Sequence, residues 1–184
     1  ICLTLLSSGQ PKSYIAFEAG YSKLLGKFGS EPFLTKVSTG RGFGYNINGA
    51  YYGDQLGFGA RIGRYYNTAR QHAIFYKGRT FKSAYLVKLW VTNVALIGPQ
   101  YGIKNERFQW DFRALFGGVK TEGPTLEWRS DNGGEMTFVT GDLQSFGYSL
   151  GVHGGYDLTN IINLGLHANY TGTLAYKING SLEY

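Results

Sequence analysis

The chain has 184 residues, a length typical of one domain. Charged residues make up 16% of it, aromatic residues another 16%, and 28 residues are glycine. This balance excludes a disordered chain, which would carry few aromatic residues and many charges. No apolar run approaches the roughly 20 residues of a membrane-spanning helix. The net charge of +6 admits an anionic partner, such as a lipid surface.

The first ten residues, ICLTLLSSGQ, have two interpretations. An apolar stretch followed by small residues is typical of the end of a secretory signal peptide, although no charged residues precede it. We therefore expect residues 1–9 to be a signal-peptide remnant and residues 10–184 to form a single domain. The alternative is an apolar first strand. Cys2 is the only cysteine, so a chain cleaved after residue 9 would hold none.

Beyond this stretch, apolar residues alternate with small or polar residues in segments of about ten. This period of two predicts β-strands with two different faces. The segment 85–103 is apolar in both phases, so its register stays open, and Gly98-Pro99 predicts a bulge in it. The eight expected strands are residues 13–22, 42–52, 56–66, 85–103, 107–119, 145–156, 161–171 and 173–184.

The connections between these segments alternate in length, except for a very short last one at Gly172. The long connections are 23–41, 67–84 and 120–144, and the short ones are 53–55, 104–106 and 157–160. Short turns on one rim and long loops on the other are typical of outer-membrane barrels. We also expect residues 120–142 to extend their hairpin as protruding strands.

The composition of the two faces favours a barrel that turns its apolar face outward. Tyrosines gather near the segment ends, where a ring with a polar tip suits a membrane interface. The opposite face is small or polar and offers little aliphatic material for a soluble core. About ten residues per segment suits a tilted strand crossing a bilayer, and a sheet in lipid must close on itself. The sequence predicts an all-β fold, an eight-stranded antiparallel transmembrane β-barrel, with a soluble barrel or sandwich as the alternative.

Three stretches carry a resemblance to a known family: GFGYNINGAYYGDQLGFGARIGRYY at 42–66, IGPQYGIKNERFQWDFRALFGG at 97–118, and the last segment ending in Tyr184. They resemble the OmpA- and OmpX-type eight-stranded barrels, and most of all the porin-like outer-membrane β-barrel proteins of Bacteroidetes-type bacteria. The resemblance implies a Gram-negative outer membrane with both termini periplasmic. It also implies that Tyr184 is an assembly signal read by the barrel-insertion machinery. The short connection at Gly172 departs from the family pattern.

The inward face of such a barrel predicts a plugged lumen. Eight strands leave an interior only wide enough for side chains, so charges of both signs should pair there. We expect Arg61 to reach Glu18 or Asp111 from neighbouring strands. The expected lumen network comprises Glu18, Arg61, Asp111, Arg113, His153, His167, Lys177 and Glu183.

Catalytic and cofactor signatures are not found in the sequence. His72 lies in a long connection with no serine or acid beside it, and no cysteine or carboxylate–histidine cluster has the spacing of metal ligands. Aromatic residues alternate with Gly, Asn and Ser rather than with Lys and Arg, which disfavours nucleic acid. We therefore expect a protein that is not an enzyme, with no cofactor, metal or nucleic-acid partner.

The expected function is a structural, interaction or adhesion role in the outer membrane. One alternative is an accessory subunit of a larger outer-membrane complex for secretion, barrel insertion or uptake, and another is a lipid-modifying enzyme. The expected partners are outer-membrane lipid, the insertion machinery and other outer-membrane proteins. Basic residues in the long connections also favour contact with the phosphates of lipopolysaccharide.

Overall fold

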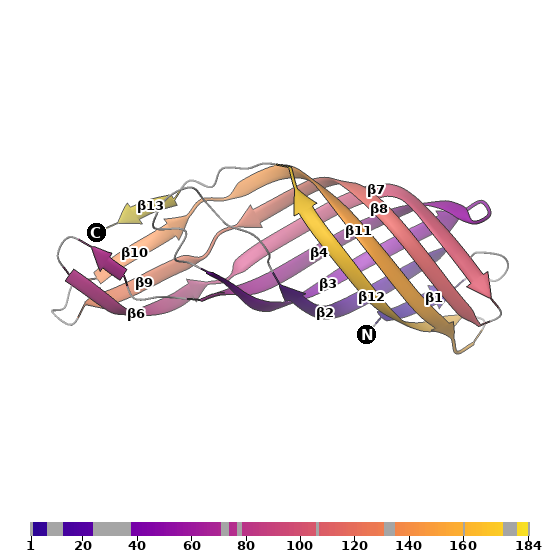
Figure 1. Cartoon of the computed structure of the whole chain (residues 1–184), viewed down its shortest axis with the longest axis horizontal. Coiled ribbons are helices and arrows are strands. Elements are labelled where there is room, and N and C mark those ends of the chain that lie inside the picture. The colour runs from indigo at the N-terminus through magenta and orange to yellow at the C-terminus, as the bar shows by residue number, and fades with distance from the viewer. Residues whose placement is uncertain are drawn as a thin grey trace.

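The computed structural model of the chain is an antiparallel β-barrel with a second, smaller sheet beyond one rim (Figure 1). It describes residues 2–6, 13–23, 38–70, 74–76, 79–105, 107–130, 135–159, 161–174 and 180–183. The barrel order is β1-β12-β11-β8-β7-β4-β3-β2. Its strands are β1 (Cys2–Leu6), β2 (Tyr14–Lys23), β3 (Ser38–Tyr52), β4 (Leu56–Arg70), β7 (Trp90–Asn105), β8 (Phe108–Glu122), β11 (Leu143–Asp157) and β12 (Ile162–Thr173).

The predicted fold class is confirmed: the described strands form an all-antiparallel β-barrel. Seven of them are long, and the five residues of β1 pair with β12 on one side and β2 on the other, which closes the ring. The register places inward-facing residues opposite each other, as with Asn48 and Arg61, and outward-facing residues opposite each other, as with Ile47 and Ile62. A slip of one residue would exchange the two faces of a strand, so the alternation itself specifies this register. Among the described residues there is no helix long and apolar enough to cross a membrane.

The segment whose register the sequence left open is divided in the structure. β6 (Arg79–Lys88) ends before β7 begins at Trp90. Both phases of β7 are apolar because Val94 and Leu96 point inward and pack against Leu115 and Val119 inside the barrel. The predicted bulge is wrong: Phe58 pairs with Pro99 and Gly59 with Gly98 without a shift in register.

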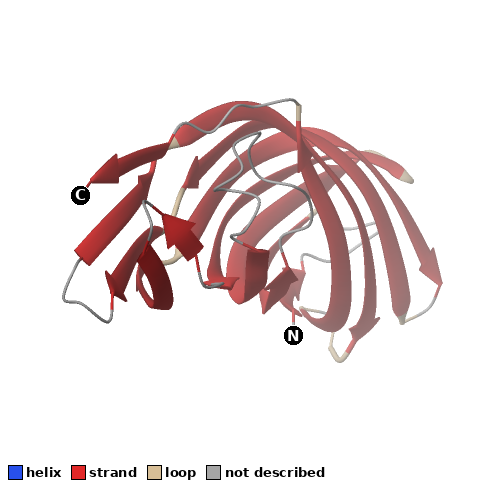
Figure 2. Cartoon of the chain, turned by 60° about the vertical axis from the view of Figure 1, so that its left-hand side comes forward, coloured by secondary structure: helices blue, strands red, loops and turns tan. Residues whose placement is uncertain are grey.

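Two of the long connections fold into the second sheet. Its strands are β5 (Ile74–Tyr76), β6, β9 (Thr125–Ser130), β10 (Glu135–Thr140) and β13 (Gly180–Glu183), in the order β13-β10-β9-β6-β5. β6 leads directly into β7, and β8 leads into β9, so the sheet extends from the barrel wall (Figure 2). The expectation that residues 120–142 form protruding strands is therefore confirmed.

The last segment, residues 173–184, is not the eighth barrel strand. β12 ends at Thr173, and Gly180–Glu183 pairs with β10 in the second sheet. β1 takes the eighth place instead, in accord with the alternative interpretation of the N-terminal stretch as an apolar first strand. The physical reason is that β1 alternates like its neighbours, with Leu3 opposite the outward-facing Phe17 and Cys2 opposite the inward-facing Glu18.

The last described strand, β13, does not lie at the rim of the short turns. It belongs to the second sheet, at the far end of the molecule (Figure 1). The periplasmic position of both termini stays a prediction.

Closure by β1 predicts a specific cross-link. Leu3 lies directly opposite Leu164 of β12, so cysteines at these positions, in a Cys2→Ser background, should form a disulfide in the folded protein under mild oxidation. Non-reducing electrophoresis would detect it. The control pair, Leu3→Cys with Leu150→Cys on β11, should stay reduced, and equal cross-linking of both pairs would contradict closure by β1.

Candidate functional site

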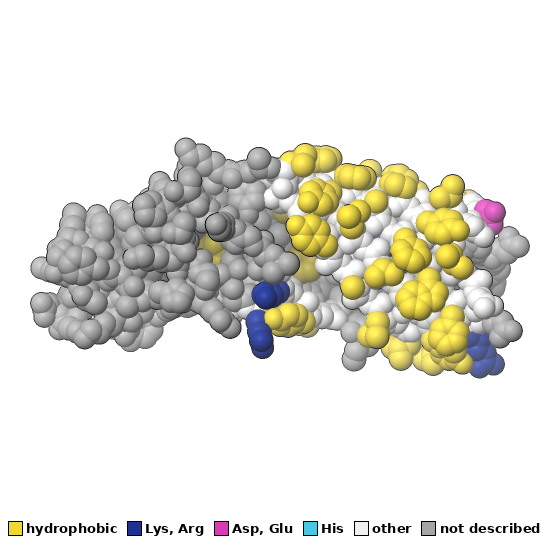
Figure 3. All heavy atoms as spheres, in the orientation of Figure 1, with side chains coloured by type: hydrophobic (Ala, Val, Ile, Leu, Met, Phe, Trp, Pro, Cys, Tyr) yellow, Lys and Arg dark blue, Asp and Glu magenta, His cyan; other side chains and the backbone are white. Residues whose placement is uncertain are grey.

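The barrel distributes its side chains in the opposite way to a soluble protein, with apolar side chains outside and polar ones inside. Apolar side chains spread over its outer surface (Figure 3), while its interior holds charged and amide side chains. Arg61 and Asp111 are both fully buried, whereas Leu166 is 79% exposed. Large apolar residues exposed on the outside come from every described long strand of the barrel: Ile15, Phe17, Phe43, Ile47, Phe58, Ile62, Ile97, Ile103, Phe108, Trp110, Phe112, Phe116, Phe146, Leu150, Leu164 and Leu166.

Arg61 is the centre of the lumen network. Its Nε donates to Asn48 Oδ1 at 2.7 Å, and its Nη1 donates to Ser149 Oγ at 3.0 Å. Its Nη2 donates to Asn169 Oδ1 at 2.6 Å and lies 3.0 Å from Nε2 of His167. One guanidinium from β4 thus joins β3, β11 and β12 across the interior.

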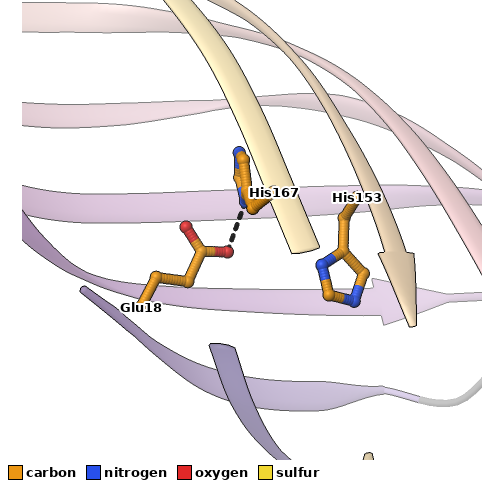
Figure 4. A group of neighbouring side chains, drawn as sticks. All are labelled: Glu18, His153 and His167. Atoms are coloured by element: carbon orange, nitrogen blue, oxygen red, sulfur yellow. Dashed lines mark hydrogen bonds and ion pairs between the residues drawn. The ribbon is translucent and has the colours of Figure 1, made fainter. Parts of the chain in front are cut away.

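Glu18 and His167 form the most closely paired ionisable groups of the lumen (Figure 4). His167 Nδ1 lies 2.5 Å from Glu18 Oε1. Since a guanidinium can only donate, Nε2 of His167 accepts from Arg61, and the ring proton is therefore on Nδ1, donated to Glu18. The arginine and the carboxylate together fix one tautomer of His167.

A second buried arginine, Arg113, lies close to the carboxylate of Glu18. Arg113 Nη1 lies 3.7 Å from Glu18 Oε1, and its Nη2 donates to the hydroxyl of Tyr14 at 3.4 Å. Asp111 accepts from the hydroxyl of Tyr52 at 2.6 Å and from Gln109 Nε2 at 3.0 Å. Two arginines and two carboxylates therefore share one layer of the lumen with matched formal charge.

Buried side chains lie in the lumen on both sides of this layer. Towards the short turns, Tyr14, Ala16, Ala50 and Tyr52 form a buried cluster. Beyond it, Asp157 bonds Lys104 at 2.8 Å and Asn163 at 2.9 Å. Towards the second sheet, the buried cluster is Val94, Leu96, Leu115 and Val119, with Tyr65 against it. The charged layer therefore lies between two clusters of packed side chains.

His153 lies in the same layer but differs from its neighbours. It is 4% exposed, and its Nδ1 has no hydrogen-bond partner within the described part of the chain. It lies directly opposite His167 on β12 and Asp111 on β8. One ligand atom from each of Glu18, His153 and His167 lies within 4.8 Å of the others. Sequence spacing gave no sign of this trio, because it comes from three different strands.

The expected lumen residues have three outcomes. Glu18, Arg61, Asp111, Arg113, His153 and His167 come together in the lumen. Glu183 does not, because its strand β13 belongs to the second sheet and pairs with β10. Lys177 and Tyr184 lie outside the described residues, and the role of Tyr184 as an assembly signal stays a prediction. The expected pairing also differs in detail, since Glu18 pairs with His167 and Arg113, while Arg61 bonds Asn48, Ser149 and Asn169.

A cluster of surface charges lies where the barrel meets the second sheet. Lys88 is 3.1 Å from Glu122, and Lys120 is 3.3 Å from Asp142. The hydrogen bond and charge of Lys88 hold the pKa of Glu122 below its ordinary value. Asp142 likewise raises the pKa of Lys120. Lys88, Lys120 and Asp142 are exposed and Glu122 is only partly buried, so their pairing adds little to stability.

Comparison of the chain with protein-family models, with curated proteins and with solved structures finds no match.

Arg61 provides the test of the lumen network. Arg61→Leu should lower the free energy of unfolding by at least about 3 kcal/mol, because it leaves several buried polar partners unsatisfied. Denaturant titration of the refolded barrel would measure this loss. The matched control is Arg64→Leu on the same strand. Arg64 lies over the Tyr66 ring at 5.3 Å, a contact worth about 0.5–1 kcal/mol. Equal losses in the two variants would contradict the network.

Proposed function

We propose that the chain is an integral barrel of a bacterial outer membrane that presents a five-stranded sheet outside the bilayer and is not an enzyme. The observation that carries this proposal is the inverted distribution of side chains. A soluble protein rarely leaves contiguous apolar patches larger than a few hundred Å² in water. Here the apolar residues cover the barrel exterior, and the charges occupy its interior. Lipid around the barrel would bury the first set without exposing the second.

The side chains that fill the lumen support an interaction role rather than transport. Charged, amide and apolar side chains fill the interior in layers, as expected of eight strands. The second sheet is the feature that a stand-alone membrane anchor would not need. We infer a structural, interaction or adhesion role in which this sheet meets a partner. The second candidate, an accessory subunit of a larger outer-membrane complex, is favoured by the same sheet.

The orientation follows from the two rims. In outer-membrane barrels the short turns face the periplasm and the longer segments face outward. The connections after β3, β7 and β11 are short, so the second sheet would lie on the outer side. This arrangement resembles the OmpA- and OmpX-type barrels in strand number and in the contrast between the two rims. Like them, the chain would be assembled by the barrel-insertion machinery.

A pair of basic residues supports contact with lipopolysaccharide on that side. Lys23 lies directly opposite Arg41 across β2 and β3, and both are exposed. Two like charges in this position repel each other. A phosphate between them would turn the repulsion into two attractive contacts.

The exterior provides the test of the proposed location. Phe112 lies on the outward face of β8, between the exposed Phe108 and Phe116, and is 47% exposed. Phe112→Arg should reduce folding into lipid vesicles, because an arginine facing the middle of the bilayer costs roughly 2–4 kcal/mol. The folded fraction can be read from the change in gel migration between boiled and unboiled samples.

The control is Leu158→Arg, in the turn between β11 and β12, where the side chain is 56% exposed. A charge near the bilayer surface should cost only about 0–1 kcal/mol. A folded fraction that drops equally in both variants, or in neither, would contradict a lipid-facing exterior.

A further inference from the structure

Within the described part of the chain, several buried polar atoms of the lumen have no hydrogen-bond partner, and Nδ1 of His153 is one of them. His153 is buried, yet neither a carboxylate nor a backbone group of the described chain accepts from or donates to its Nδ1. An unsatisfied buried polar group costs about 1–3 kcal/mol. The ring also fits closely against β12, because a Cβ at Gly165 would collide with His153 Cε1. The position of His153 is therefore specific, although the hydrogen bonds do not account for it.

The neighbours of His153 are metal-binding groups. Figure 4 shows Glu18 turned toward His167, with His153 beside them on the neighbouring strand. Their ligand atoms lie within 4.8 Å of one another, so small side-chain rotations bring all three to about 2.0–2.2 Å from one ion. Two imidazoles and a carboxylate are a common ligand set for Zn²⁺ and related divalent ions. Three protein ligands that leave one position open to water or a small ligand are also a common arrangement around zinc.

We propose that Glu18, His153 and His167 form a site for Zn²⁺ or a similar borderline divalent ion, which fastens β2, β11 and β12 to one another. The Glu18 carboxylate offsets part of the charge of the ion, and Asp111 offsets one of the two nearby arginines. This proposal does not depend on where the barrel resides, since it concerns only the lumen.

Binding requires a defined set of proton movements. The ion takes the place of the proton between His167 Nδ1 and Glu18, and that proton moves to Nε2 of the same ring. Arg61 then loses its contact with Nε2 but keeps Asn48, Ser149 and Asn169. The ion thus replaces the hydrogen bond between His167 and Glu18 and gives the buried His153 ring a partner.

The test refolds the 184-residue chain, without a polyhistidine tag, in the presence of Zn²⁺ or Co²⁺ alone. We expect one tightly held ion per barrel by elemental analysis after gel filtration. With Co²⁺ we expect the visible absorption of a centre with imidazole and carboxylate ligands. Zn²⁺ should also raise the midpoint of denaturant unfolding, because it binds only the folded state.

Matched variants separate this site from surface binding and from misfolding. His153→Gln should weaken metal binding more than about 100-fold, since even loss of an outer partner of a metal site costs 10–100-fold. The control Asn163→Ala, on the same strand as His167, should bind as the unmodified chain does. The proposal would be overturned if the barrel refolded in Zn²⁺ and yet held no metal. It would also be overturned if the His153→Gln variant bound Zn²⁺ as tightly as the unmodified chain.

Discussion

The narrow interior of an eight-stranded barrel is the constraint on which the rest of this structure depends. Such an interior is filled by side chains, so every inward charge must find a partner within the barrel. Arg61 and Arg113 meet this condition together with Glu18 and Asp111, and amide and hydroxyl groups accept further hydrogen bonds from Arg61. Breaking one buried partner from such a set is costly, because it leaves an uncompensated charge. The lumen network is therefore what allows a polar interior to be stable.

The same constraint assigns the apolar residues to the outside. When alternate residues of each strand fill the lumen, the intervening residues point outward and must suit whatever surrounds the barrel. Phe17, Phe58 and Phe112 take such positions. An apolar exterior needs an apolar environment, so the composition of the lumen and the proposed location in lipid are two results of one alternation. The second sheet is free of this constraint, since it lies beyond the rim.

The sequence predicted this alternation and its two faces, because period two is a local property of each segment. It could not predict which inward groups meet. Asp111, His153 and His167 come together only because β8, β11 and β12 are neighbours in a particular register. Nor could it choose the closing strand. Residues 2–6 and 173–184 both alternate, and only the pairing of Leu3 with Phe17 and Leu164 decides between them. An eighth barrel strand at 173–184 would put Glu183 in the lumen, so the sequence alone predicts its position wrongly.

The central claim, that the outer surface of the barrel lies in hydrocarbon, can be tested most directly at Trp110. This side chain points outward and is 50% exposed, whereas Trp90 is buried at 1%. A chain with Trp110 as its only tryptophan, through Trp90→Phe and Trp128→Phe, would be refolded into vesicles whose acyl chains carry bromine. The account predicts strong quenching of Trp110 fluorescence and little quenching in the matching chain that keeps only Trp90. Unquenched Trp110 in a folded barrel would contradict it.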